Sequence, residues 1–219
     1  MLRAILFDCD GVIADTEPVH FKLFQEVLAE EGISLSESQY YEEYVGMRDK
    51  ECFEAVFVRA TKSLSADKLV GLIQKKHHLI DKRFRQNLVI FKPTIELIHA
   101  ARKECILAVV SGGLRKEIEQ ILEIAGITDA FQTVIAAEDV PAGKPDPAGY
   151  LLGLQRLGVH PKEAIGIEDT IPGIQAVQGA GMKCVALANG FSSTDLKMAD
   201  LIFQKGETIS LGKIIDIVT

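Results

Sequence analysis

The sequence predicts an α/β protein: a Rossmann-like, doubly wound parallel sheet that carries an inserted all-helical cap domain. In the second half of the chain, short continuous apolar runs alternate with helical patterns, which is typical of a parallel sheet covered on both faces. The first apolar run, residues 3–7, has the same strand-like character. Between these parts, residues 16–87 show helical patterns and no strand-like run.

The predicted core alternates strands and helices along the chain. Asp146 and Pro147 form a helix start signal, an N-cap candidate followed by proline at the first helical position. The strands are expected at residues 105–110, 133–137, 164–167, 183–187 and, more weakly, 200–203, with helices near 94–103, 114–125, 147–157 and 172–180.

The predicted cap is a separate domain on two linkers. Its helical patterns cover residues 20–32, 50–61 and 66–85, and the linkers are expected near residues 14–16 and 86–87. The domains are therefore predicted as a catalytic core of residues 1–15 and 88–219 and a cap of residues 16–87.

Composition narrows the class of protein. The 219 residues carry a net charge of −7, which argues against nucleic acid or an anionic membrane as the main partner. The four scattered cysteines form no metal-like spacing and suggest reduced thiols, hence a cytoplasmic protein. No uncharged apolar run approaches the ~18 residues of a membrane span, and Asp8 interrupts the apolar N-terminus, so we expect no signal peptide. A monomer is expected.

Two aspartates end the first predicted strand. In the stretch LFDCDGVIADTE, Asp8 and Asp10 stand two residues apart, so both would project to the same side. Two negative charges at such a short distance repel one another, and burial removes their solvation. A nearby cation is the usual compensation. An ordinary Asp-Gly turn is the alternative, but a turn does not explain a carboxylate doublet at the end of an apolar strand. Cys9 alternates away from the pair and is interpreted as a buried structural thiol.

Other polar residues follow the remaining predicted strands. Because ligands of a doubly wound sheet bind at the carboxyl ends of its strands, these residues are expected to converge. They are Ser111, Gly112 and Gly113 after the strand CILAVV, Lys144 in the sequence GKP beyond TVIAA, and Glu168 and Asp169 after AIGI.

This combination suits phosphoryl transfer, in which catalysis consists mostly of positioning and of neutralising charge. An aspartate can attack phosphorus, and a second one can protonate the leaving group and then activate water. A hydroxyl, backbone amides and a lysine can hold the phosphoryl oxygens, and further carboxylates suit Mg²⁺.

The segments DCDGVIADTE, Ser111 after its strand, GKP and GIEDT, in this order, resemble the four motifs of the haloacid dehalogenase superfamily. The likeness spans the whole chain and is closest to the branch of β-phosphoglucomutases and phosphoglycolate-type phosphatases, which carry a helical cap after the first motif. The resemblance implies that Asp8 is the nucleophile and a metal ligand, and that Asp10 is the acid/base and a ligand through its carbonyl. It also implies that Ser111 and Lys144 hold the phosphoryl group and that Asp169 binds Mg²⁺.

The sequence allows two alternatives for the metal ligands. Glu168 either binds the metal directly or contacts the residues that bind it. Glu138 and Asp139 compete for the metal, but the family's motif order favours Glu168 and Asp169.

The cap offers candidate substrate-binding residues. The resemblance places His20 facing the site, whereas His77 and His78 are expected to be solvated. A distal anion of the substrate would need a cation, for which the candidates are Arg48, Lys75, Lys76 and Arg115. Sugar-phosphate mutases of this branch typically have Gly-x-x-Arg where this chain has Gly46-Met47-Arg48, a departure by one residue.

The predicted function is Mg²⁺-dependent hydrolysis of a small phosphomonoester, a sugar phosphate or similar compound, through a phospho-aspartate. The main alternative is a hexose-phosphate mutase with the same core chemistry. A dehalogenase is disfavoured because such enzymes usually lack an aspartate at position 10. A phospho-accepting signalling domain is a remote alternative, since such domains are much shorter and have no cap.

Overall fold

The structure is a computed structural model that describes residues 1–218, with Asp81 described by its backbone only. It divides into two compact units, one of Met1–Asp15 together with the chain from Val89 onward, and one of Thr16–Leu88. We call them the core and the cap. Within the described part of the chain, none of the helices combines the length and the apolar character of a membrane span.

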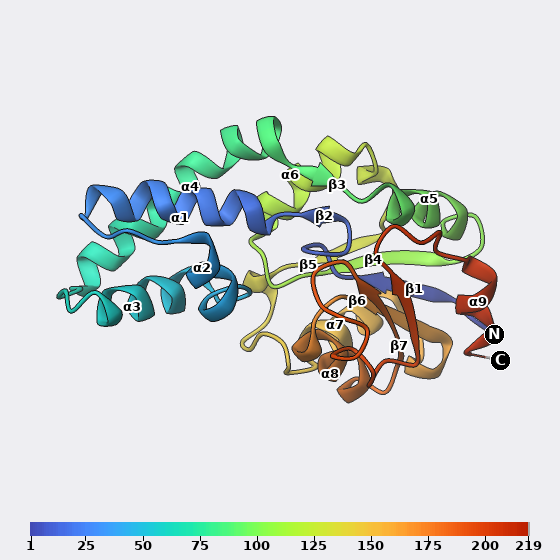
Figure 1. The fold of residues 1–219 in the computed structure, drawn as a ribbon. Coiled ribbons are helices and arrows are strands. Elements are labelled where there is room, and N and C mark those ends of the chain that lie inside the picture. Colours follow the sequence, from blue (N-terminus) through green and yellow to red (C-terminus); the bar gives the residue numbers. More distant parts are fainter. Residues whose placement is uncertain (219) are drawn as a thin grey trace. The chain divides into compact units, whose positions relative to one another are not determined.

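The core is built on a six-stranded parallel sheet (Figure 1). Its strands lie in the order β5-β4-β1-β6-β7-β8. Their bounds are Ala4–Phe7 (β1), Ile106–Val110 (β4), Thr133–Ile135 (β5), Ala164–Glu168 (β6), Lys183–Ala188 (β7) and Leu201–Gln204 (β8). The predicted doubly wound α/β fold is thus confirmed, with β1 at the centre between β4 and β6.

Helices cover both faces of this sheet. Figure 1 shows α7 and α8 on one side and α5 on the other. On the first side, Ala4 and Leu6 of β1 pack in one buried cluster with Leu154 of α7 and Val177 of α8. The core helices are α5 (Lys92–Ala101), α6 (Arg115–Ala125), α7 (Ala148–Leu157), α8 (Ile171–Gly179) and α9 (Leu211–Asp216), with short 3₁₀ turns at Thr128–Ala130, Ala137–Asp139 and Pro161–Glu163.

The predicted start of α7 was wrong by one residue. Pro147 is not the first helical residue but the N-cap, with a helix-like backbone of φ −75° and ψ −1°, and the helix begins at Ala148. The side chain of Asp146 still satisfies a backbone group at the start of the helix, since its Oδ1 accepts a hydrogen bond from the Ala148 amide at 2.9 Å.

The cap is helical, and its helices are α1 (Glu17–Glu30), α2 (Glu37–Glu43), α3 (Asp49–Arg59) and α4 (Ala66–Asn87). Its core consists of apolar and aromatic side chains, among them Phe24 and Phe53 with ring centroids 5.0 Å apart. The expected linker at residues 86–87 is instead the last turn of α4. The chain passes between the two units twice. The segments at these two points form short antiparallel strands, β2 (Ala14–Asp15) paired with β3 (Val89–Ile90).

Candidate functional site

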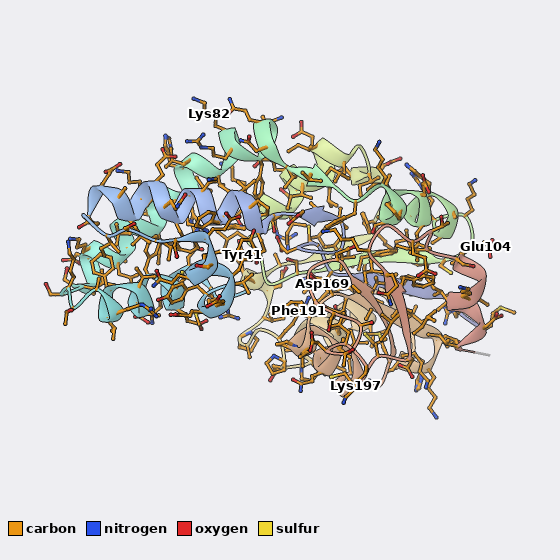
Figure 2. All side chains as sticks on the ribbon, in the orientation of Figure 1. Tyr41, Lys82, Glu104, Asp169, Phe191 and Lys197 are labelled. Carbon is orange, nitrogen blue, oxygen red and sulfur yellow. The ribbon has the colours of Figure 1, made fainter. Side chains whose placement is uncertain are left out.

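The carboxyl ends of β1, β4 and β6 bring together polar residues from distant parts of the chain. The carboxylates of Asp8, Glu168 and Asp169 offer oxygen atoms that all lie within 4.8 Å of one another. All three residues are buried, and Glu168 is fully so. Figure 2 labels Asp169, which immediately follows β6. The three acids after β1 and β6 therefore form one cluster, as expected from parallel strands that end at one edge.

Lys144 supplies the positive charge at this cluster. Its Nζ lies 2.5 Å from Asp8 Oδ1 and 2.5 Å from Glu168 Oε1. Burial acts to lower the pKa of Lys144, but the carboxylates of Asp8 and Glu168 outweigh this effect and raise that pKa above its usual value. The lysine is therefore an ammonium held between two carboxylates.

Asp10 and Ser111 form a second part of the site. Ser111 Oγ donates a hydrogen bond to Asp10 Oδ2 at 3.0 Å and accepts one from the Gly113 amide at 2.9 Å. These contacts fix the loop after β4 against the loop after β1, so that an aspartate, a hydroxyl and a glycine-rich backbone lie together. A Cβ added to Gly112 would meet nothing within 4 Å.

Two glycines allow the carboxylates to approach the backbone. Gly11 has φ +77°, and a Cβ on it would lie 1.9 Å from Asp169 Oδ2. Gly173, in the first turn of α8, would place its Cβ 2.0 Å from Glu168 Oε2. A larger residue at either position would displace one of the acids, because these contacts are far below van der Waals distance.

Burial within the acidic cluster raises the pKa of two of its members. Burial, partly offset by Lys144 and reinforced by repulsion from Glu168 and Asp10, raises the pKa of Asp8 to about 8. Burial, together with the charges of Asp8 and Glu168, also raises the pKa of Asp169 well above its usual value. One ammonium cannot neutralise three buried carboxylates, so the cluster either keeps protons or takes up a cation.

The donor set fits a divalent cation. Asp169 Oδ1 is buried and has no hydrogen-bond partner among the described residues. A buried carboxylate oxygen without a donor costs free energy that a metal ion would recover. Hard oxygen ligands are those preferred by Mg²⁺. The residues that could hold such an ion are Asp8, Asp169 and, by distance alone, Glu168.

These pKa values predict that the metal-free protein loses stability as the pH rises. A carboxyl group whose pKa is raised on folding contributes stability that is full below its unfolded-state pKa of about 4. This contribution is lost as the pH rises to the folded-state pKa, which is about 8 for Asp8. In EDTA, we expect the contribution of Asp8 alone to lower the free energy of unfolding by about 4 kcal/mol between pH 5 and pH 8.5. Urea titrations at a series of pH values would measure the free energy of unfolding. Asp169→Asn should flatten this dependence, and a free energy that rises over this range would contradict the prediction.

The competing pair Glu138 and Asp139 has structural partners instead. Asp139 pairs with Arg115 and with Arg156, the latter at 3.0 Å, and Glu138 accepts hydrogen bonds from the Arg115 amide at 3.2 Å. Both acids thus contact Arg115, the first residue of α6, as predicted by the interpretation that they are loop or capping residues. The guanidinium of Arg115 is held by Asp139 and the Val134 carbonyl rather than offered to a substrate.

Two of the cap candidates, His20 and Lys76, lie in a polar cluster within the helical unit. Lys76 is only 1% exposed; its Nζ is 2.5 Å from Asp49 Oδ1, 3.0 Å from His20 Nδ1 and 4.5 Å from the Phe24 ring centroid. His77 was predicted to be solvated, and this was wrong, since its Nε2 lies 3.0 Å from Asp49 Oδ2. Arg48 is exposed at the N-cap of α3.

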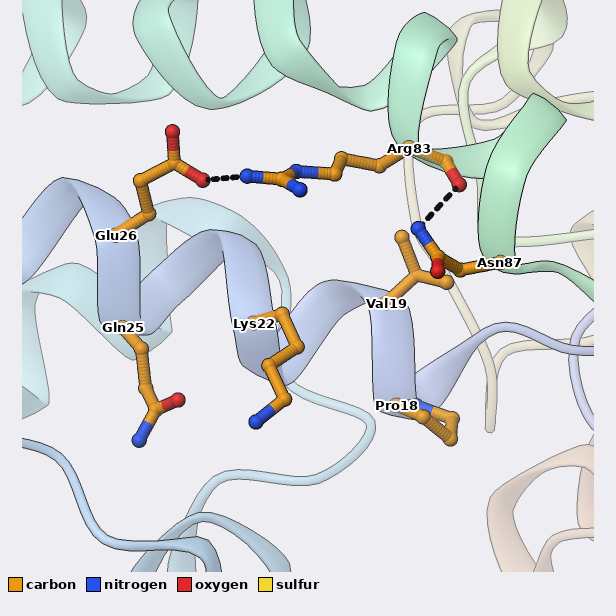
Figure 3. A pocket seen from close by; sticks show the side chains of 7 residues that line it. All are labelled: Pro18, Val19, Lys22, Gln25, Glu26, Arg83 and Asn87. Carbon is orange, nitrogen blue, oxygen red and sulfur yellow. Dashed lines mark hydrogen bonds and ion pairs between the residues drawn. The ribbon is translucent and has the colours of Figure 1, made fainter.

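A pocket on the cap is lined by none of these residues (Figure 3). It opens between α1 and α4, where Glu26 pairs with Arg83 at 2.5 Å and Asn87 donates to the Arg83 carbonyl at 3.3 Å. Its lining consists of Pro18, Val19, Lys22, Gln25, Glu26, Arg83 and Asn87. None of these was predicted as a site residue, and the pocket lacks the carboxylate cluster of the core.

Sequence reasoning missed two residues of the core site. Asn189 Nδ2 donates to the Gly11 carbonyl at 2.8 Å, and the Tyr150 hydroxyl donates to Glu168 Oε1 at 2.6 Å. Asn189 directly follows β7, so the strand-end rule that found Ser111 would also have found it. Tyr150 gives no such signal because it lies inside a helix and resembles a core aromatic residue.

Comparison with known proteins identifies the family. The family model for haloacid dehalogenase-like hydrolases matches residues 5–187. A putative phosphatase of Bacillus subtilis (strain 168) is 31% identical over 89% of this chain and 87% of its own length. A β-phosphoglucomutase of the same organism is 26% identical over 96% and 92% of the two chains.

The crystal structure of CbbY from Rhodobacter sphaeroides in complex with phosphate superimposes with a TM-score of 0.82 at 27% identity, covering 93% of this chain and 94% of that one. The fold, the order of the motif residues and these matches agree. The chain is a member of the haloacid dehalogenase-like hydrolase family, in the branch of β-phosphoglucomutases and phosphoglycolate phosphatases.

Proposed function

We propose that this protein is a Mg²⁺-dependent phosphatase that hydrolyses a small phosphomonoester, such as a sugar phosphate, through a phospho-aspartate at Asp8. The observation that carries the proposal is the cluster of Asp8, Glu168 and Asp169 around Lys144, with Asp10 and Ser111 beside it. The names of the relatives support the same chemistry, since they include phosphatases that act on phosphorylated carbohydrates and on fructose 1-phosphate.

In the first step, a carboxylate oxygen of Asp8 attacks phosphorus, and the bond between phosphorus and the ester oxygen breaks. The leaving alcohol takes a proton from Asp10, which is held by Ser111 through the 3.0 Å hydrogen bond. Lys144 and the Ser111 loop hold the phosphoryl oxygens during this transfer.

In the second step, water attacks the phosphorus of the phospho-aspartate while Asp10 accepts a proton from it. The acyl phosphate bond breaks, and inorganic phosphate leaves with Asp8 restored. Mg²⁺, held by Asp8, the Asp10 carbonyl and Asp169, would supply positive charge against the negative phosphoryl group. This charge matters because the site contains four carboxylates and one lysine, so a phosphate dianion would otherwise be repelled.

The cap favours a phosphatase over a mutase. Where mutases of this branch have the arginine of Gly-x-x-Arg, this chain has Asp49. Burial opposes ionisation, but the hydrogen bond from His77 and the charge of Lys76 lower the pKa of Asp49 to about 2. Of the other cations considered for a second phosphate, Lys75 pairs with Glu30 and Arg115 with Asp139.

We therefore expect water rather than a sugar to receive the phosphoryl group. With β-glucose 1-phosphate, Mg²⁺ and optional glucose 1,6-bisphosphate, phosphorus NMR should show only free phosphate as product, with no need for the bisphosphate. Rapid formation of glucose 6-phosphate with little free phosphate would establish the mutase instead. If glucose 1-phosphate is not consumed at all, phosphate release should be measured across sugar phosphates, phosphoglycolate, nucleotides and pyrophosphate, and no release from any of them would refute the proposal.

A further inference from the structure

Tyr150 is a buried polar residue with no part in the reaction steps above. It lies on α7, is 0% exposed and donates its hydroxyl hydrogen to Glu168 Oε1 at 2.6 Å. A phenol hydroxyl in an apolar helix face needs a partner, and phenylalanine would fill the same space without one. Its hydrogen-bond partner is the carboxylate of Glu168, which belongs to the acidic cluster of the core.

The contacts of Glu168 leave neither carboxylate oxygen free. Oε1 receives the Tyr150 hydroxyl and the Lys144 ammonium, the latter at 2.5 Å. Oε2 accepts from the Asp169 amide at 3.3 Å and lies against the backbone of Gly173. Asp169, in contrast, has the buried Oδ1 without a partner. Of the two acids, Asp169 is thus the one with an oxygen available to a metal ion, and Glu168 is engaged with the lysine.

Tyr150 also contacts the lysine directly. The Nζ of Lys144 lies 5.4 Å from the centroid of the Tyr150 ring, within the range of a cation–π interaction. The same Nζ is 2.5 Å from Asp8 Oδ1. The ammonium is therefore positioned by the tyrosine ring and by the carboxylate that the tyrosine hydroxyl orients.

We propose that Tyr150 is a positioning residue, whose hydroxyl holds Glu168 in the orientation that keeps Lys144 beside Asp8, where it meets the phosphoryl oxygens. Without the hydroxyl, Oε1 of Glu168 loses one of its two donors, and the carboxylate can rotate away from the lysine. This inference rests on the proposed phosphatase function for the role of Lys144, but its geometric part can be tested without turnover.

The variant Tyr150→Phe keeps the ring and removes the hydroxyl. Isothermal titration with inorganic phosphate in the presence of Mg²⁺ should show phosphate binding weakened by about tenfold, the loss expected for a hydrogen bond to a charged group. The Mg²⁺ half-saturation should not be weakened, because Asp8 and Asp169 are untouched. The matched control is Tyr44→Phe, which removes a hydroxyl from a 4% exposed tyrosine of the cap and should leave both values unchanged. Phosphate affinity within twofold of the parent in Tyr150→Phe would overturn the proposal.

Nitrogen NMR of the lysine ammonium groups gives a second readout that does not depend on the function. The Lys144 signal, identified by its loss in Lys144→Met, should be protected from hydrogen exchange in the parent and in Tyr44→Phe, and broadened in Tyr150→Phe. If the parent protein neither binds phosphate nor releases it from any ester, the proposed function fails, and this signal alone decides the role of Tyr150. A Lys144 signal that is unchanged in Tyr150→Phe would refute it.

Discussion

Replacing Asp8 by asparagine is expected to lower the rate of phosphate release by about 10⁴-fold or more. An amide cannot attack phosphorus, and it is a poorer metal ligand than the carboxylate, so one change removes two functions. The measurement is single-turnover phosphate release at saturating Mg²⁺ with the best substrate of the phosphoester panel. Acid quenching of the parent enzyme should also trap a covalent phosphoryl group, which mass spectrometry should not detect in the variant.

Loss of folding should not explain this result. Burial raises the pKa of Asp8 to about 8, so removing its charge relieves an unfavourable contribution at that pH, and the metal-free variant should be at least as stable as the parent. Asp195→Asn, at an exposed serine–aspartate contact of 2.6 Å, is the matched control and should keep full activity. Activity of Asp8→Asn within tenfold of the parent would place the nucleophile elsewhere.

Replacing Lys144 by alanine is expected to reduce kcat/KM by about 10³-fold and to weaken phosphate binding. The ammonium is the cation that lies within 2.5 Å of both Asp8 and Glu168, so its removal leaves two buried carboxylates facing the incoming phosphate. Steady-state kinetics and phosphate titration would measure the two effects.

The surface variant Lys183→Ala provides the control, since that lysine is 56% exposed and pairs with Asp200 outside the site. Small alkylammonium ions added to Lys144→Ala should restore part of the activity, because they supply the lost charge without a covalent link. Rescue that is equally strong in the parent protein, or a loss of less than tenfold in the variant, would argue against a phosphoryl-binding role.

The sequence alone determined the six strands of the parallel sheet, the core helices except α9, and most of the residues at the carboxyl edge of the sheet. Continuous apolar strands between helices leave few arrangements other than a doubly wound parallel sheet, and such a sheet brings its strand ends together. Asp8, Ser111 and Asp169 could thus be grouped although they are far apart in the chain. Local signals carried this information, because Asp8 and Ser111 directly follow apolar runs and Asp169 comes one residue after another such run.

Local patterns were less informative in the cap. The helix α2 is seven residues long and buries only Tyr40 of its own side chains, so it has no clear apolar periodicity. His77 resembled a solvated residue because its partner, Asp49, lies on another helix. A helical wheel shows which face of a helix is apolar, but not which polar side chain of a neighbouring helix meets it.

Only the tertiary structure shows which contacts each acid at the site makes. Glu168 and Asp169 are adjacent and chemically similar, so the sequence left open whether Glu168 binds the metal beside Asp169. In the fold, Tyr150 and Lys144 engage Glu168, while Asp169 Oδ1 remains without a donor among the residues described. Strand order and apolar periodicity are properties of the local chain, whereas the partner of a buried carboxylate depends on which side chains of other elements come within about 3 Å of it.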